Sequence, residues 1–203
     1  MRLFISPGHA GMVGDQYMTR GKQSPEVPPG IYEGEFNRVV SKIVERTVRT
    51  LGKKDSTCLL PGPMSVSPTA RAAFVNDYIR RSGDPAIFLA VHANASPKPG
   101  WSAAAGARVF VARNASSTSV AFAHQIMAEW SRREDNNEIG IRAPRQLKRA
   151  NFTVLEKTMC PAVLIECGFM TNELDARYMA TGHGRSAIAG VLACAYLDTL
   201  ALQ

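Results

Sequence analysis

Ala162-Val163-Leu164-Ile165 is an apolar run that begins after Pro161 and ends at Glu166. A second apolar run, Ile87-Phe88-Leu89-Ala90-Val91, ends at His92 in the same way. Short runs without polar alternation are typical of strands that are buried on both faces of a sheet. Such strands need helices on both sides, so these two stretches predict an α/β fold.

The rest of the chain alternates shorter apolar runs with amphipathic segments. Apolar residues recur every three or four positions between Phe36 and Leu51, which predicts a helix that ends at Gly52. Ser67-Pro68 is typical of a helix start, and that helix is expected to end near Gly83. Further strands are expected at Leu3–Ile5, Thr57–Leu60 and Ala107–Ala112, further helices at Ser117–Arg133, Asn172–Ala180 and Gly184–Leu202, and a loop at Glu134–Arg149.

We therefore expect a single-domain α/β fold, with a mixed, mostly parallel twisted sheet flanked by helices on both faces. The length of 203 residues suits one domain over residues 1–203. A hydrophobic content of 45% and a charged content of 20% exclude a disordered or fibrous chain. The longest apolar runs are strand-sized, so no membrane insertion is expected. No secretory signal is recognisable after Met1, and we expect synthesis in the cytoplasm.

The net charge is strongly positive, because 24 Lys and Arg outnumber 17 Asp and Glu to give +7. A basic surface attracts acidic partners, which include nucleic acid, an anionic membrane and an anionic cell-wall polymer. The densest basic groups, Arg49–Lys54 and Arg142–Arg149, are not interleaved with stacking aromatic residues. Composition alone leaves these partners open.

Residues capable of metal binding or acid–base chemistry follow three of the expected strands. His9 follows the expected strand at Leu3–Ile5. His92 directly follows the run that ends at Val91, and Glu166 directly follows the run that ends at Ile165. Glu33 stands at the start of the long helix. Ligands of open α/β sheets gather at the carboxyl ends of the strands. Each residue also has an ordinary structural explanation, but together they suit a His₂Glu zinc site with an additional carboxylate.

The words around these residues are more specific than their spacing. They read Ser6-Pro7-Gly8-His9-Ala10-Gly11, Glu33-x-x-x-Asn37, Val91-His92-Ala93-Asn94, and Pro161 to Asn172 with Glu166-x-Gly168-Phe169-x-Thr171-Asn172. In this order the chain resembles the zinc-dependent N-acetylmuramoyl-L-alanine amidases over nearly its whole length. That family shows P-G-H-x-G, a Glu leading a helix, S-x-H-x-N and P-x-x-L-x-E-x-G-F-x-[ST]-N.

The resemblance implies a role for each of these residues. His9, Glu33 and His92 would bind one catalytic Zn²⁺, and Glu166 would be the catalytic acid and base. The reaction would be hydrolysis of the amide between N-acetylmuramic acid and L-alanine in peptidoglycan. Asn94 and Asn172 are weaker candidates for substrate binding, since either residue also suits a turn or a helix cap.

One local feature departs from the family pattern and a second adds to the resemblance. The family often has Asp before Pro-Gly-His, where this chain has Ser6, so the orientation of His9 has a different support. Thr69-x-Arg71 with Asn76 resembles the E-R-x-x-x-A-N helix that precedes the second His in the family.

The expected biological role is that of a phage or prophage endolysin. It would consist of the amidase catalytic domain with no separate wall-binding domain, and it would reach the wall after the membrane is permeabilised. Peptidoglycan is then the expected partner, with electrostatic contact to the anionic envelope in place of nucleic acid. The alternatives are a bacterial amidase of wall remodelling, a zinc carboxypeptidase acting on stem peptides, and a non-enzymatic binder that needs no zinc.

Overall fold

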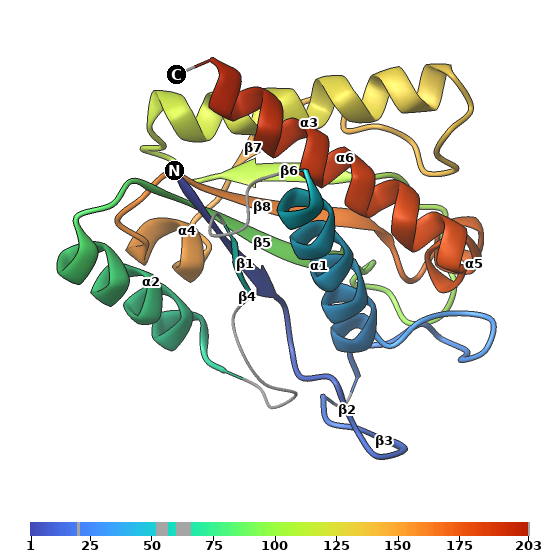
Figure 1. Ribbon diagram of the computed structural model, residues 1–203. Coiled ribbons are helices and arrows are strands. Elements are labelled where there is room, and N and C mark those ends of the chain that lie inside the picture. Colours follow the sequence, from blue (N-terminus) through green and yellow to red (C-terminus); the bar gives the residue numbers. More distant parts are fainter. Residues whose placement is uncertain (20, 52–56, 60–65, 203) are drawn as a thin grey trace.

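The computed structural model describes residues 1–19, 21–51, 57–59 and 66–202, and it is built around one twisted sheet (Figure 1). The sheet has six strands in the order β4-β1-β5-β8-β6-β7. Neighbouring strands are parallel except β6 and β8, which are antiparallel. The bounds are β1 (Arg2–Pro7), β4 (Thr57–Leu59), β5 (Ala86–Asn94), β6 (Arg108–Val111), β7 (Leu147–Arg149) and β8 (Ala162–Phe169).

Helices cover both faces of this sheet, so the predicted fold class is confirmed (Figure 1). The larger hydrophobic core lies between the sheet and one helical layer, while a smaller core lies under the opposite layer. The first layer contains α1 (Glu33–Thr50), α3 (Ser117–Asp135), α5 (Glu173–Ala180) and α6 (Gly182–Ala201), and the second contains α2 (Pro68–Ser82) and α4 (Thr153–Lys157). No helix among the described residues is long and apolar enough to cross a membrane.

The central strand β8 contributes side chains to the hydrophobic cores on both faces of the sheet. Its side chains alternate between the two faces, as in any strand. Val163 and Ile165 therefore enter the larger core, while Ala162 and Leu164 enter the smaller one. The same alternation places Glu166 on the face of Leu164, toward α2 and α4.

Helix α2 begins and ends where the sequence predicts. The Ser67 Oγ accepts a hydrogen bond from the backbone N–H of Ala70 at 3.2 Å, and Pro68 occupies the first helical position. The helix ends at Gly83, which adopts the left-handed conformation with φ of 70° that favours glycine. Its N-terminus therefore lies at a defined place, next to the carboxyl ends of the strands.

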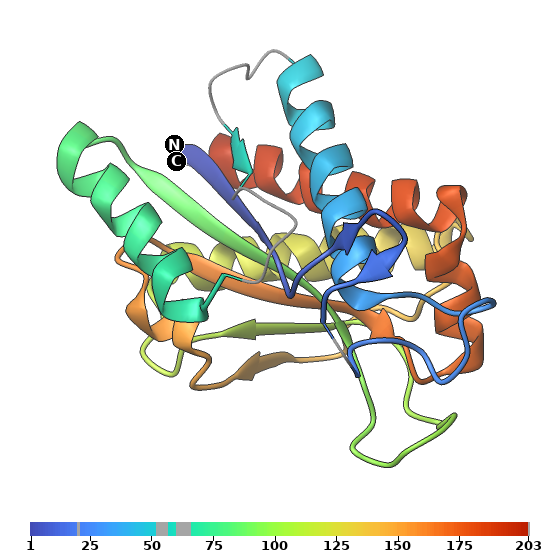
Figure 2. The same cartoon turned by 90° about the horizontal axis from the view of Figure 1, so that it is seen from below.

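Several short elements differ from the sequence-based expectation. Strand β7 lies inside the stretch expected to be a loop, because a three-residue edge strand with the sequence Leu-Lys-Arg carries no hydrophobic pattern. Helix α4 spans one turn, and the hairpin of β2 (Met12–Val13) and β3 (Gln16–Tyr17) follows β1. The hairpin lies beside the first turn of α1 (Figure 2).

The two central strands are longer than their apolar runs. β5 continues to Asn94 and β8 continues to Phe169, so His92 and Glu166 lie within strands and do not follow them. The expected helix face is correct up to Val48, but Leu51 lies outside α1 and is exposed. A pattern of apolar residues ends a strand at the first polar residue, although the backbone pairing of the strand continues beyond it.

Candidate active site

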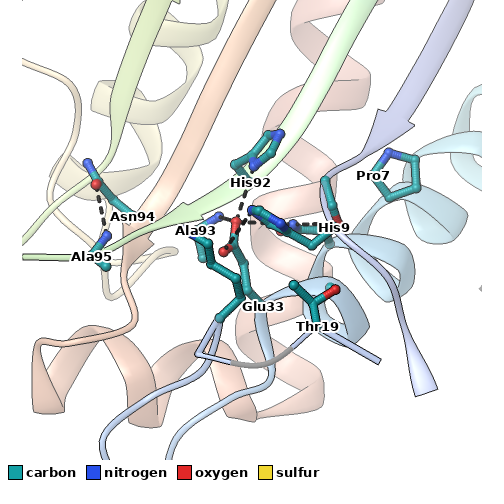
Figure 3. Close-up of polar contacts among 12 residues, drawn as sticks. Pro7, His9, Thr19, Glu33, His92, Ala93, Asn94 and Ala95 are labelled. Carbon is teal, nitrogen blue, oxygen red and sulfur yellow. Dashed lines mark hydrogen bonds and ion pairs between the residues drawn. The ribbon is translucent and has the colours of Figure 1, made fainter. Parts of the chain in front are cut away.

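Three side chains from separate elements meet at the carboxyl ends of β1 and β5. His9 comes from the loop after β1, Glu33 is the first residue of α1, and His92 points from β5 (Figure 3). The His9 Nε2 lies 3.2 Å from Glu33 Oε2, and the His92 Nδ1 lies 3.1 Å from Glu33 Oε1. One ligand atom from each residue lies within 4.8 Å of the others, so the group could hold a metal ion.

The backbone around this group leaves no room for larger residues. A Cβ on Gly8 would overlap the imidazole ring of His92, and a Cβ on Gly34 would overlap the backbone carbonyl of Ala10. His9 itself has a φ of 58°, in the left-handed region that non-glycine residues rarely adopt. The close approach of three chain segments is therefore built into these positions.

Glu33 is the charged centre of the group. Its side chain is buried, and burial by itself raises the pKa of the carboxyl group. Hydrogen bonds to His9 and His92 outweigh that effect and lower the pKa of Glu33 to about 2. The backbone N–H of Ala93 also donates to Glu33 Oε1 at 3.3 Å. An ionised carboxylate between two imidazoles is a donor set that suits Zn²⁺.

The two imidazoles are open to one side. The side chains of His9 and His92 are 26% and 22% exposed, whereas that of Glu33 is 3% exposed. Both rings border a cavity of about 440 Å³ on the face of the sheet that carries α2 and α4. A metal ion held by these residues would therefore keep a position that water or substrate can reach, as catalytic zinc sites require.

Glu166 lies beside His92, because the two residues are register partners in the adjacent strands β8 and β5. It borders the same cavity. Its Oε2 is shielded from solvent and has no hydrogen-bond partner among the described residues. Burial, together with the negative charge of Glu33, raises the pKa of Glu166 to about 8. This carboxyl group can therefore exchange a proton near neutral pH.

The two asparagine candidates lie elsewhere. The Asn94 Oδ1 accepts a hydrogen bond from the backbone N–H of Ala95 at 2.8 Å. The Asn172 side chain caps α5 by accepting from Asp175 N at 3.1 Å, and it donates to the carbonyl of Ser102 at 3.1 Å. Neither residue borders the cavity. Their role in substrate binding stays a prediction.

Arg71 is a residue of the site whose position the sequence does not reveal. It comes from α2, borders the cavity and is only 7% exposed. Its Nη1 donates to Ser6 Oγ at 2.8 Å and to the carbonyl of Pro7 at 2.6 Å. The only sequence signal is the resemblance of Thr69-x-Arg71 to a family motif, which does not say what the guanidinium contacts.

Comparisons with known proteins agree on one family. Residues 3–195 match the profile of the N-acetylmuramoyl-L-alanine amidase family. A search of curated proteins returns no match. Among solved structures, an N-acetylmuramoyl-L-alanine amidase from Clostridium difficile 630 is 22% identical, with a TM-score of 0.78 over 98% of this chain and 96% of that one.

Two other solved structures share this fold. The amidase Ami1 from Mycobacterium smegmatis is 22% identical, with a TM-score of 0.76 over 100% of this chain and 98% of that one. The catalytic domain of the CD27L endolysin, which targets Clostridia difficile, is 19% identical, with a TM-score of 0.68 over 98% of this chain and 97% of that one. The family match spans the sheet and every element that supplies the site, and the chain therefore belongs to the N-acetylmuramoyl-L-alanine amidases.

Proposed function

We propose that this amidase uses one zinc ion to hydrolyse the amide bond between N-acetylmuramic acid and L-alanine in peptidoglycan. The observation that carries the proposal is the cluster of His9, Glu33 and His92, which opens into a cavity shared with Glu166. The family match supports the substrate and the bond. The geometry of the donor set supports the metal.

His9, Glu33 and His92 would hold the ion through two imidazole nitrogens and one carboxylate. The burial of Glu33 keeps its negative charge at the closed side of the cluster, while the partly exposed imidazoles face the cavity. When bound, zinc supplies a Lewis acid that polarises the amide carbonyl and lowers the pKa of a water molecule. The absence of a side chain at Gly8 and Gly34 allows the segments that carry the three donors to approach one another closely.

Glu166 would carry the proton. Its carboxylate would accept a proton from the attacking water and would donate it to the leaving nitrogen of L-alanine. The absence of hydrogen-bond partners at its Oε2, among the described residues, leaves the carboxyl group available for both transfers. Such proton transfer typically contributes about 10²–10⁴-fold to a rate.

Two variants separate metal binding from proton transfer. Glu166→Gln is expected to retain about one zinc per chain and to lose hydrolysis by about 10²–10⁴-fold. His92→Ala is expected to lose both zinc and hydrolysis. His124→Ala, at an exposed histidine of α3, is the matched control and should keep both. Zinc is measured by elemental analysis after dialysis, and hydrolysis by digestion of purified peptidoglycan with and without a chelator.

The products distinguish the proposed reaction from its alternatives. Free lactyl carboxylates on muramic acid support the amidase, whereas new termini only within the stem peptide would indicate a carboxypeptidase. Near wild-type digestion by Glu166→Gln would overturn the role of Glu166. Wall binding that persists without any zinc or hydrolysis would favour a non-enzymatic binder.

We further propose that the hydrolysis serves host-cell lysis, as in an endolysin. The positive net charge of +7 supports this role, because it favours contact with an anionic envelope. Purified protein should reduce the turbidity of a suspension of bacteria whose membrane has been permeabilised, so that the protein can reach the wall. Hydrolysis of isolated wall without loss of turbidity in such cells would favour wall remodelling instead.

A further inference from the structure

Arg71 carries a buried positive charge, and its hydrogen-bond partners among the described residues are all neutral. Its three hydrogen bonds go to Ser6 Oγ, the carbonyl of Pro7 and the carbonyl of Val66, the last at 2.9 Å from Nε. Within the described part of the chain no carboxylate forms an ion pair with Arg71. Of the segments that are not described, residues 60–65, which precede α2, contain no acidic residue, and residues 52–56 contain one, Asp55.

The surroundings of Arg71 leave this charge without compensation. Burial lowers the pKa of Arg71 to about 10, and the like charge of Arg38 acts in the same direction. The first turn of α2 contains no acidic residue, and its N-terminus borders the cavity through Ser67 and Pro68. A helix N-terminus adds partial positive charge. Buried charges in proteins are normally paired, because an unpaired one is costly to desolvate.

A ligand can reach the Arg71 side chain from the cavity. Arg71 borders it together with His9, His92 and Glu166, so a ligand in contact with the guanidinium would also be close to the proposed reaction centre. The lining of the cavity also includes the apolar side chain of Leu164, on the face of the sheet that carries α2 and α4. The space of about 440 Å³ suits a short, partly polar segment of a muramyl peptide.

We propose that Arg71 binds a carboxylate of the muramyl peptide, which supplies the missing counter-charge. This inference rests on the proposed function and identifies an anion-binding subsite within the substrate cavity. Two carboxylates are available in this substrate class. One is the free α-carboxylate of D-isoglutamate, the residue that follows L-alanine in the stem peptide, and the other is the lactyl carboxylate that hydrolysis releases on muramic acid.

A matched pair of substrates tests the first source. N-acetylmuramoyl-L-alanyl-D-isoglutamate and its D-isoglutamine analogue differ only by the carboxylate and its amide. The zinc-loaded protein is expected to prefer the carboxylate substrate by about tenfold or more in kcat/KM, because hydrogen bonds to charged groups contribute strongly. Arg71→Met should abolish the preference, Arg71→Lys should retain part of it, and Arg80→Met, an exposed arginine of the same helix, should leave it unchanged.

A pair of sugars tests the second source without any turnover. N-acetylmuramic acid carries the lactyl carboxylate, and N-acetylglucosamine lacks it. Preferential binding of the first sugar to the zinc-loaded Glu166→Gln protein, measured by calorimetry and lost on adding Arg71→Met, would assign the subsite to the product. Zinc content is measured for every variant, so that loss of the metal is recognised.

The ratio between paired ligands separates binding from positioning. If Arg71 only holds Ser6 and Pro7, Arg71→Met lowers activity on both substrates equally, and neither ratio changes. That result, or the absence of any preference in the wild-type protein for both pairs, would overturn the inference. Hydrolysis of the D-isoglutamine substrate without a preference would leave the proposed function intact, whereas failure to hydrolyse either substrate would count against both.

Discussion

Replacing Glu166 by Gln is expected to have opposite effects on stability and on activity. In the metal-free protein, burial raises the pKa of Glu166 from 4.5 to about 8. The unfolded chain therefore releases this proton at a much lower pH than the folded protein does. A carboxyl group with a raised folded pKa stabilises the fold fully only below its unfolded pKa, and this contribution is lost as the pH rises toward the folded value.

The size of the effect follows from the two pKa values. Between pH 5 and pH 7.5 the folded protein keeps the Glu166 proton that the unfolded chain releases. At about 1.4 kcal/mol per pH unit, the wild-type protein loses about 3 kcal/mol of unfolding free energy over this range through Glu166. Glu166→Gln has no such proton to release, so its unfolding free energy lacks this loss. The difference in unfolding free energy between the variant and wild type should therefore shift by about 3 kcal/mol in favour of the variant from pH 5 to pH 7.5.

Urea denaturation of chelator-treated protein at several pH values measures this difference directly. We compare the change in unfolding free energy with pH, because the cost of burying the glutamine amide does not depend on pH and cancels in that change. Glu26→Gln, at an exposed carboxylate, measures what the loss of a charge does by itself. Stability curves of wild type and Glu166→Gln that stay parallel from pH 5 to pH 7.5 would refute the reasoning, because they would mean that Glu166 is not an unpaired buried carboxyl group.

Three further changes test other parts of the structure. Gly34→Ala would push a Cβ into the Ala10 carbonyl, so urea denaturation should show a loss of about 1–3 kcal/mol and zinc content should fall. Trp130→Phe removes the indole N–H that donates to the Ile141 carbonyl at 2.9 Å, and the unfolding free energy should fall by about 1–3 kcal/mol. Burial raises the pKa of the Cys167 thiol well above its usual range, so mass spectrometry should find Cys167 unmodified after treatment of the native protein with iodoacetamide at pH 8 and modified after denaturation.

Much of the candidate site could be predicted because its residues stand in local sequence words. Pro7-Gly8-His9 carries a tight turn, and the close contact of Gly8 with His92 explains why a glycine stands there. The structure brings His9, Glu33 and His92 together across separations of 24 and 59 residues, and spacing alone could not predict that meeting. Parallel strands account for it, since their carboxyl ends share one edge of the sheet.

The sequence by itself determined the elements with strong local patterns. The apolar runs became β5 and β8, and Ser67 and Gly83 delimit α2, because side-chain periodicity and capping act between residues close in the chain. Short elements such as β7 carry no such pattern. Their existence depends on pairing with a neighbour that is distant in sequence.

Only the tertiary structure decided the electrostatics of the site. The contact of Arg71 with Ser6 spans 65 residues, and the raised pKa of Glu166 arises from burial and from the charge of Glu33 on another element. Burial and long-range charge are properties of the space that several segments enclose. No segment of sequence contains that space, so the Glu166 carboxyl group and the Arg71 guanidinium acquire their electrostatic properties only when the chain folds.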